Sequence, residues 1–108
     1  DDSLAGGLGN DTLVGGLGDD TLSGGGGFDL ADYSGATAVA VDLGLAVAQD
    51  TGIGSDTLLN VENLLTGSGN DSLRGSTQGN TLTAGAGNDT LNGALGNDVL
   101  VGLDGIDT

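Results

Sequence analysis

The sequence repeats a nine-residue unit that is rich in glycine and carries an aspartate at a fixed position. Residues 6–14 read GGLGNDTLV and residues 15–23 read GGLGDDTLS, and residues 24–32 (GGGGFDLAD) form a degenerate third unit. A unit this short offers only one regular large apolar side chain, so it cannot bury a core alone. Successive units must therefore stack on one another.

The same frame returns in the second half of the chain. The later units are TGIGSDTLL at 51–59, TGSGNDSLR at 66–74, GSTQGNTLT at 75–83, AGAGNDTLN at 84–92, GALGNDVLV at 93–101 and GLDGIDT at 102–108. Six residues interrupt the frame after position 59. We therefore divide the chain into a first repeat block (1–32), a spacer with one isolated repeat (33–65) and a second repeat block (66–108). We expect them to form one continuous solenoid.

Three columns of the unit predict its local structure. The eighth position is almost always leucine with non-core neighbours, which indicates a very short strand with one inward residue. The second and fourth positions are mostly glycine, which permits the positive φ of tight turns. A turn and a strand in each unit predict an all-β coil that closes a circuit every two units, or 18 residues.

The sixth position is aspartate in nine of ten units, with Asn80 the exception. Neighbouring strands lie about 4.8 Å apart, so aspartates two units apart are stacked at roughly that spacing. Carboxylates this close repel each other by roughly 1 kcal/mol in water and by more inside a protein. The chain holds 16 acidic residues against one basic residue, a net charge of −15, so it cannot neutralise these ladders internally.

A divalent cation is the natural counter-charge for such a ladder. Carboxylates and backbone carbonyls suit Ca²⁺, whereas Mg²⁺ prefers a tighter octahedron. The absence of His and Cys argues against dedicated zinc or copper sites. With one basic residue the chain also offers no surface for nucleic acid or anionic membranes, and its apolar stretches are too short for membrane insertion.

Catalysis by paired carboxylates requires unequal environments, which a uniform ladder does not provide. The chain also lacks His, Cys and a GxSxG motif. We therefore expect no catalytic residues and no organic cofactor in this segment. The parent protein is free to carry a separate catalytic domain.

The unit GGxGxDxUx, in which U is a large aliphatic residue, resembles the RTX or hemolysin-type calcium-binding repeat of proteins exported by type I secretion. The stretches FDLADYSGATAVAVDLG and SDTLLNVENLLTGSGNDSLRG are similar to spacers between RTX blocks. The resemblance implies a parallel β-roll, several Ca²⁺ ions held between turns, and folding after export from a bacterium to the exterior or cell surface. It also implies an adjoining enzyme, toxin or adhesin domain in the parent chain.

Carried onto this sequence, the resemblance implies metal ligands in both blocks. The implied carboxylate ligands are Asp2, Asp11, Asp20, Asp29, Asp71, Asp89, Asp98 and Asp107. The implied loop carbonyls lie around Gly7, Gly9, Gly16, Gly18, Gly25, Gly27, Gly67, Gly69, Gly85 and Gly87. The expected ladder pairs are Asp2 with Asp20, Asp11 with Asp29, Asp71 with Asp89, Asp89 with Asp107, and Asp98 with Asn80.

Two residues at the sixth position, Asp56 and Asn80, differ from the others. Asp56 lies 15 rather than 18 residues before Asp71, so the sequence defines no ladder partner for it. The turn before Asn80 has Ser76 and Gln78 where the pattern has glycine, so we expect a weakened or empty site there.

Residues 33–50 lack the turn pattern and have the length of one circuit. Val39, Val41 and Leu43 alternate as in a strand, so we expect a non-metal coil or side hairpin. Asp32, Asp42 and Asp50 are expected to be surface charges rather than ligands. Glu62 and Asn63 are expected to cap or bond a local turn.

The sequence thus predicts a calcium-binding module that folds with calcium and is disordered without it, because high net charge with few aromatic residues disfavours a metal-free fold. The alternative is a structural, adhesive or surface-layer segment whose roll surface binds a partner. The seventh position offers an outward threonine ladder for such a surface, at Thr12, Thr21, Thr57, Thr81, Thr90 and Thr108. The third position is not a regular array, which argues against ice binding.

Overall fold

The computed structural model describes all residues 1–108, and every regular element in it is a β-strand. The strands are β1 (Ser3–Leu8), β2 (Thr12–Leu13), β3 (Thr21–Gly26), β4 (Leu30–Thr37), β5 (Ala40–Asp42), β6 (Gln49–Asp50), β7 (Ser55–Leu59), β8 (Asn63–Ser68), β9 (Ser72–Arg74), β10 (Thr81–Thr83), β11 (Thr90–Asn92) and β12 (Val99–Val101). No helix in the structure is long and apolar enough to cross a membrane.

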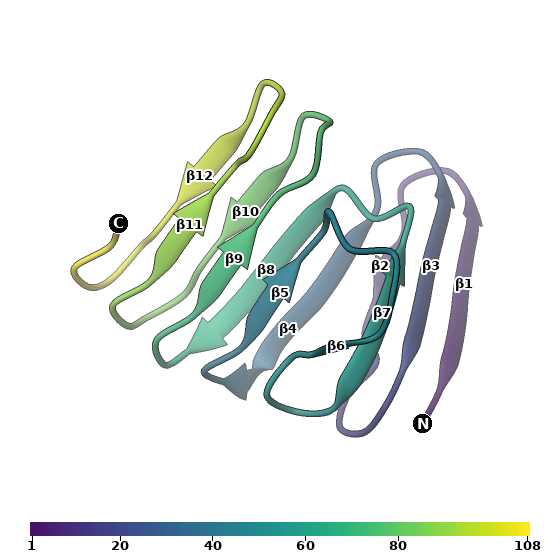
Figure 1. The fold of residues 1–108 in the computed structure, drawn as a ribbon, viewed down its shortest axis with the longest axis horizontal. Helices are drawn as coiled ribbons and strands as arrows, with labels where there is room; N and C mark the ends of the chain where they lie inside the picture. The colour runs from purple at the N-terminus through teal and green to yellow at the C-terminus, as the bar shows by residue number, and fades with distance from the viewer.

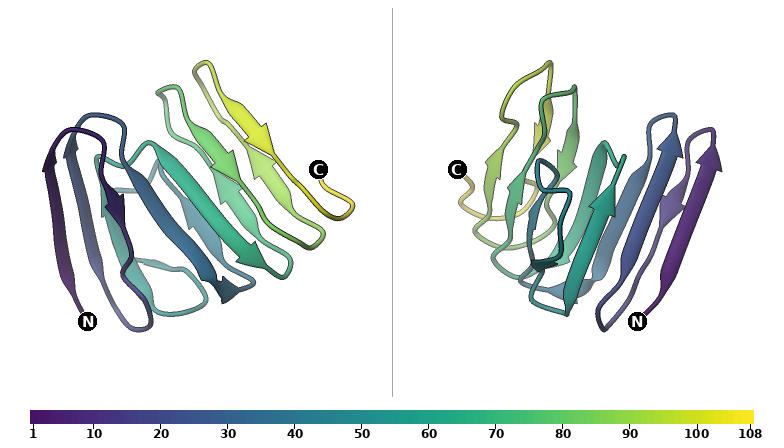
Figure 2. Two further views of the ribbon diagram at one scale, coloured as in Figure 1. Left: turned by 180° about the vertical axis from the view of Figure 1, so that it is seen from behind. Right: turned by 45° about the vertical axis from the view of Figure 1, so that its right-hand side comes forward.

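The chain winds between two layers of parallel strands, and the termini lie at opposite ends of the stack (Figures 1 and 2). One layer is a five-stranded sheet in the order β2-β4-β8-β10-β12. The other layer contains the β1-β3-β7-β6 sheet followed by the β5-β9-β11 sheet. The predicted parallel β-roll with two repeats per circuit is therefore confirmed, within overall dimensions of 35 × 30 × 20 Å.

The eighth-position side chains stack in register and fill the space between the layers. Leu4 pairs with Leu22 one circuit later, and Leu82 pairs with Leu100 in the same way. Burial of each such leucine contributes about 1.5–3 kcal/mol. The buried apolar core is a single cluster made of Leu13, Leu22, Ala31, Tyr33, Val39, Val41, Leu58, Val61, Leu64, Leu73, Leu82 and Ala84.

The turns take the backbone conformation that the glycine columns predict. Gly7 and Gly9 both have φ of 107°, and most glycines at the second and fourth positions are likewise positive. Ala94 and Leu103 occupy the second position without glycine and still adopt φ of 67° and 68°. In these two turns the backbone adopts the left-handed conformation even without glycine, so the turn geometry sets it there.

The spacer pairs with strands of the roll, and the chain reverses its direction within the spacer. After β4 the chain passes to β5, whose Val41 pairs in register with Leu73 of β9. It then turns back through β6, which runs antiparallel to β7, while β7 packs beside β3. The strand is shorter than predicted: β5 covers only Ala40–Asp42, so Val39 and Leu43 flank it, and Val39 and Val41 are buried. The antiparallel pair of β6 and β7 is a hairpin, one of the two forms expected for this stretch, but its two-residue register leaves no pattern in the sequence that would locate it.

The six residues that interrupt the sequence frame form a shortened repeat unit. Leu64 pairs with Ala31 on one side and with Leu82 on the other, so it occupies an eighth-position slot. Glu62 stands two residues before Leu64, as aspartate stands before leucine in other units. The nine-residue frame cannot be recognised in the sequence here because the turn of this unit is shortened around Asn60, which has a φ of 50°.

Candidate metal centre

The sixth-position side chains form two ladders, one at each edge of the roll. The residues of ladder A lie at or near the starts of strands in the layer that contains β1. The residues of ladder B lie at or near the starts of strands in the layer that contains β2. Ladder A consists of Asp2, Asp20, Asp56, Asp71, Asp89 and Asp107. Ladder B consists of Asp11, Asp29, Glu62, Asn80 and Asp98.

In most rungs one side-chain oxygen accepts the backbone N–H of the preceding rung, whereas Asp71 Oδ1 accepts that of Val39. In ladder A, Asp20 Oδ1 accepts the backbone N–H of Asp2 at 2.6 Å, and Asp89 Oδ1 accepts that of Asp71 at 2.8 Å. Asp107 Oδ1 accepts the N–H of Asp89 at 3.0 Å. These charge-assisted bonds tie the carboxylates into the sheet edge.

Ladder B is fastened in the same way. Asp29 Oδ1 accepts the N–H of Asp11 at 2.9 Å, and Asp98 Oδ1 accepts that of Asn80 at 2.9 Å. The structure thus brings together all five pairs that the sequence places one circuit apart. It also gives Asp56 a neighbour, since Asp56 Oδ1 accepts the N–H of Asp20 at 3.0 Å.

The second carboxylate oxygen is where the rungs differ. Five aspartates have a buried Oδ2 that accepts no hydrogen bond from the protein, and they are Asp11, Asp20, Asp29, Asp71 and Asp89. Leaving a buried acceptor unpaired costs about 1–3 kcal/mol, and more when it is charged. All five belong to the set of aspartates that the family resemblance implies as metal ligands. A cation would satisfy these oxygens.

These oxygens face the turns of their own repeat units. A Cβ atom built on Gly6 would lie 2.5 Å from Asp11 Oδ2, and one on Gly15 would lie 2.6 Å from Asp20 Oδ2. In these two units the carboxylate therefore packs directly against the first-position glycine, where a side chain would not fit. Their Oδ2 atoms thus lie beside a turn that also presents backbone carbonyls.

Fourth-position carbonyls supply further oxygens. The carbonyl oxygens of Gly9, Gly69 and Gly87 accept no hydrogen bond within the protein. By contrast, those of Gly67 and Gly85 accept the N–H groups of Ala86 and Asp104, at 2.8 and 3.2 Å. In the second block the fourth-position carbonyls therefore keep more free lone pairs than the second-position ones.

The set of oxygens fits a hard divalent cation. No group of three or more carboxylate, His or Cys side chains converges in the structure, so backbone carbonyls must complete any coordination shell. Calcium accepts six to eight oxygen ligands in flexible geometry, including backbone carbonyls. The five unpaired carboxylate oxygens and the neighbouring free carbonyls match that requirement.

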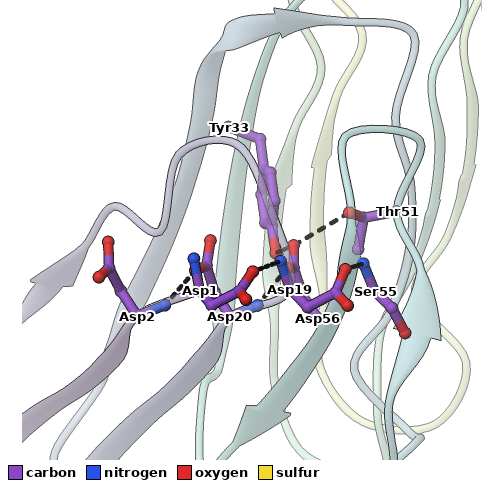
Figure 3. Close-up of polar contacts among 8 residues, drawn as sticks. All are labelled: Asp1, Asp2, Asp19, Asp20, Tyr33, Thr51, Ser55 and Asp56. Carbon is purple, nitrogen blue, oxygen red and sulfur yellow. Dashed lines mark hydrogen bonds and ion pairs between the residues drawn. The ribbon is translucent and has the colours of Figure 1, made fainter.

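At the central rung of ladder A, Asp56, the second carboxylate oxygen has contacts within the protein. Asp56 Oδ2 accepts the Tyr33 hydroxyl at 2.9 Å and lies 2.9 Å from the Thr51 hydroxyl (Figure 3). Burial, followed by the charges of Asp56 and Asp20, raises the pKa of Tyr33 well above its usual value. The phenol therefore remains a hydrogen-bond donor to Asp56.

At the centre of ladder B, the side chains also form hydrogen bonds within the protein. Glu62 is buried, and its Oε2 accepts the N–H of Asp29 at 3.0 Å, so it bonds a distant strand rather than a local turn. Asn80 donates its amide to the Glu62 carbonyl at 2.8 Å and accepts the N–H of Ser76 at 2.7 Å. The signal for Glu62 is the spacing Glu-x-Leu, which parallels Asp-x-Leu in the other units.

Sequence reasoning missed a second set of ladders at the fifth position. Asn10 Oδ1 accepts the N–H of Phe28 at 2.9 Å, and Asn70 Oδ1 accepts that of Asn88 at 2.9 Å. These bonds run to the following rung, whereas the sixth-position bonds run to the preceding one. The recurrence of Asn or Asp at this position was the available signal: Asn10, Asp19, Asn70, Asn88 and Asn97.

The other acidic residues in or beside the spacer bond to protein groups near the surface. Asp42 forms an ion pair with Arg74 at 2.9 Å, and Asp50 Oδ1 accepts the N–H of Gly52. Asp32 Oδ1 accepts the N–H of Ser34. All three carboxylates have solvent access.

The seventh-position threonines do not form one ladder. Thr21 pairs with Thr57 in one layer, whereas Thr12 and Thr81 lie in the other. No single face therefore carries a continuous threonine array.

Comparison with known families agrees with this geometry. The model of the RTX calcium-binding nonapeptide repeat matches in four copies, over residues 1–31, 65–100 and 75–108. The chain belongs to this family, whose repeat is a structural calcium-binding module typical of secreted bacterial proteins. No curated protein matched the chain.

Proposed function

We propose that this chain is a calcium-dependent folding and stabilising module of a secreted protein, and that it is not catalytic by itself. The observation that carries the proposal is the set of five buried carboxylate oxygens without a protein partner. They lie in the same repeat units that the family model matches. Several calcium ions, bound in both repeat blocks, would satisfy them.

Electrostatics explains why calcium and folding are coupled in this proposal. The ladders stack like charges in a chain whose net charge is −15. In calcium-free solution each rung adds repulsion and an unpaired acceptor, while ordering the backbone costs about 1–2 kcal/mol per residue. A divalent ion between rungs turns both penalties into attraction, so binding free energy becomes folding free energy.

The same coupling supports export as the setting of the module. A chain that stays unfolded at low calcium passes a secretion channel and folds where calcium is abundant. We therefore place the protein outside the cell or at the cell surface, with export by the type I route that the family resemblance implies. An adjoining enzyme, toxin or adhesin domain would then be joined to a roll that folds when calcium binds.

No comparable observation supports a catalytic site or an adhesive surface as the role of this segment. The family match favours the calcium-binding module over the adhesive alternative. Calcium is the only ligand class for which the structure presents a repeated set of unpaired oxygens.

Isothermal titration with Ca²⁺, Mg²⁺ and Zn²⁺ tests the proposal on the 1–108 chain. We expect several calcium ions to bind and Mg²⁺ and Zn²⁺ to compete poorly, because the ligands are oxygens in flexible turns. Asp11→Ala should lower the number of calcium ions bound, while Asp42→Ala should leave it unchanged. Equal affinity for zinc, or no binding of calcium, would refute the proposal.

A further inference from the structure

The unit at residues 51–59 departs from its neighbours at its first position, where Thr51 replaces glycine. At Asp11 and Asp20 the carboxylate packs so closely against the first-position glycine that a Cβ there would lie 2.5 and 2.6 Å from Oδ2. At residue 51 a side chain is present instead, and the threonine hydroxyl lies 2.9 Å from Asp56 Oδ2. Thr51 thus gives the carboxylate a polar contact that a glycine cannot supply.

Tyr33 completes the closure from the opposite layer. Its ring is buried in the core, and its hydroxyl donates to the same Asp56 Oδ2 at 2.9 Å. The phenol comes from β4, in the layer across from Asp56 on β7. Figure 3 shows Tyr33 on β4 and Thr51 in the turn before β7 approaching the carboxylate.

The carbonyl at this turn is engaged as well. The Gly54 carbonyl accepts the N–H of Thr51 at 2.9 Å and lies 3.0 Å from the Thr51 hydroxyl. The equivalent carbonyls of Gly9 and Gly69 accept no hydrogen bond in the protein. Both kinds of oxygen that would bind calcium elsewhere in the roll are therefore already bonded at Asp56.

Thr66 shows that a first-position threonine is not sufficient for this closure. It occupies the same position in the next repeat, yet its buried hydroxyl has no hydrogen-bond partner, and Asp71 Oδ2 in that unit is also unpaired. Asp71 thus remains a calcium-type rung. The combination of Thr51 with Tyr33 distinguishes Asp56.

We propose that Tyr33 and Thr51 form a hydrogen-bonded latch that replaces calcium at Asp56 and excludes the ion from the central rung. The latch links this rung to the preceding one without metal, because Asp56 Oδ1 also accepts the N–H of Asp20. This inference rests on the proposed calcium function of the other rungs. It makes Tyr33 and Thr51 the residues that determine which rungs take an ion.

The test compares two conservative variants of the 1–108 chain, Asp56→Asn and Asp20→Asn, by counting bound calcium after equilibrium dialysis at saturating calcium. Both aspartates are buried, and both accept an N–H from the preceding rung. At position 56 the new amide can donate to the two hydroxyl oxygens, so the count should equal that of the wild type. Asp20→Asn should lose at least one ion, with a calcium midpoint raised roughly tenfold.

The outcomes separate the two proposals. A loss of calcium in Asp56→Asn equal to that in Asp20→Asn would overturn the latch and leave the calcium function standing. Failure of the wild type to bind calcium would overturn both. The pattern of no loss at position 56 and a loss at position 20 supports both.

A second variant tests the latch in the opposite direction. Tyr33→Phe with Thr51→Val removes both donors at nearly constant volume and leaves Asp56 Oδ2 as unpaired as that of Asp20. We expect the folded double variant to bind one more calcium ion than the wild type, and an unchanged count would contradict the latch. If the double variant does not fold even in calcium, the comparison of Asp56→Asn with Asp20→Asn decides.

Discussion

The rungs at the centre of the roll differ from the rungs on either side in the partners of their buried side-chain oxygens. At Asp20 and Asp89 the second carboxylate oxygen is buried without a partner, whereas at Asp56 two hydroxyl groups contact it. Ladder B shows the same contrast between Asp29 and the amide of Asn80. A repeat protein can therefore alternate metal-dependent and metal-independent stacking along one solenoid.

The difference follows from a few side chains in an unchanged backbone frame. Leu58 of the central unit pairs with Leu22 in the register used throughout that layer. The ladder bond from Asp20 to Asp56 is likewise the same as the bond from Asp2 to Asp20. The donors around the carboxylate change, while the fold does not.

The core at the centre provides the largest expected effect. Leu64 is fully buried between Ala31 and Leu82, whereas Leu100 at the end of the sheet is 47% exposed. Leu64→Ala should lower the free energy of unfolding in calcium by about 2–5 kcal/mol. Denaturant titration of Leu100→Ala serves as control, and an equal loss there would show that central packing has no special weight.

Tyr33→Phe should be the next largest change. It leaves Asp56 Oδ2 without one of its two donors, which costs about 1–3 kcal/mol. The pKa of Tyr33 is raised in the folded state by burial and by Asp56 and Asp20. Its contribution is thus fully present below the unfolded pKa of about 10 and is lost as pH rises above that value.

Thermal unfolding between pH 8 and 11 checks this dependence. The wild type should lose stability above about pH 10, and Tyr33→Phe should lose less over the same interval. Tyr33 is the only tyrosine, so its ultraviolet absorbance reports its ionisation directly. Ionisation at the pH of free tyrosine in the folded roll would contradict the buried hydrogen bond.

An outer rung should respond to calcium rather than to pH. Asp89→Ala removes a carboxylate whose Oδ2 is unpaired, and it should raise the calcium midpoint of folding roughly tenfold, or about 1.4 kcal/mol. Asp42→Ala removes an exposed partner of Arg74 and should shift the midpoint little. Equal shifts in calcium titrations of the two variants would argue against the ligand role of the ladder.

The fifth-position ladder provides the smallest change. Asn88→Ala removes the acceptor for the N–H of Ile106, which lies on an exposed turn. We expect a loss of about 0.5–1.5 kcal/mol in calcium-loaded protein, with the number of bound ions unchanged. A drop in the ion count would instead assign Asn88 a part in the metal site.

Much of the fold could be predicted because the repeat encodes it locally. The period set the circuit, Leu22 and Leu82 marked the core, and the glycine columns marked turns with positive φ. The spacer could not be predicted in the same way. Its place depends on pairing between β5 and β9 and on the compressed turn around Asn60, which are contacts between distant or irregular segments.

The candidate site shows the same limit. The column of aspartates identified the ladder positions, but the state of each Oδ2 depends on side chains from other strands. Tyr33 lies 23 residues from Asp56, and no spacing rule links them. Glu62 carried a detectable signal in the Glu-x-Leu spacing, which the altered frame concealed.

The coupling of folding to calcium is tested most directly by circular dichroism of the 1–108 chain during a calcium titration that starts in chelator. We expect a coil spectrum without calcium and a cooperative change to a β-strand spectrum as calcium is added. Addition of excess chelator should reverse the change. A strand spectrum that is already complete in chelator and insensitive to calcium would show that folding is not coupled to calcium.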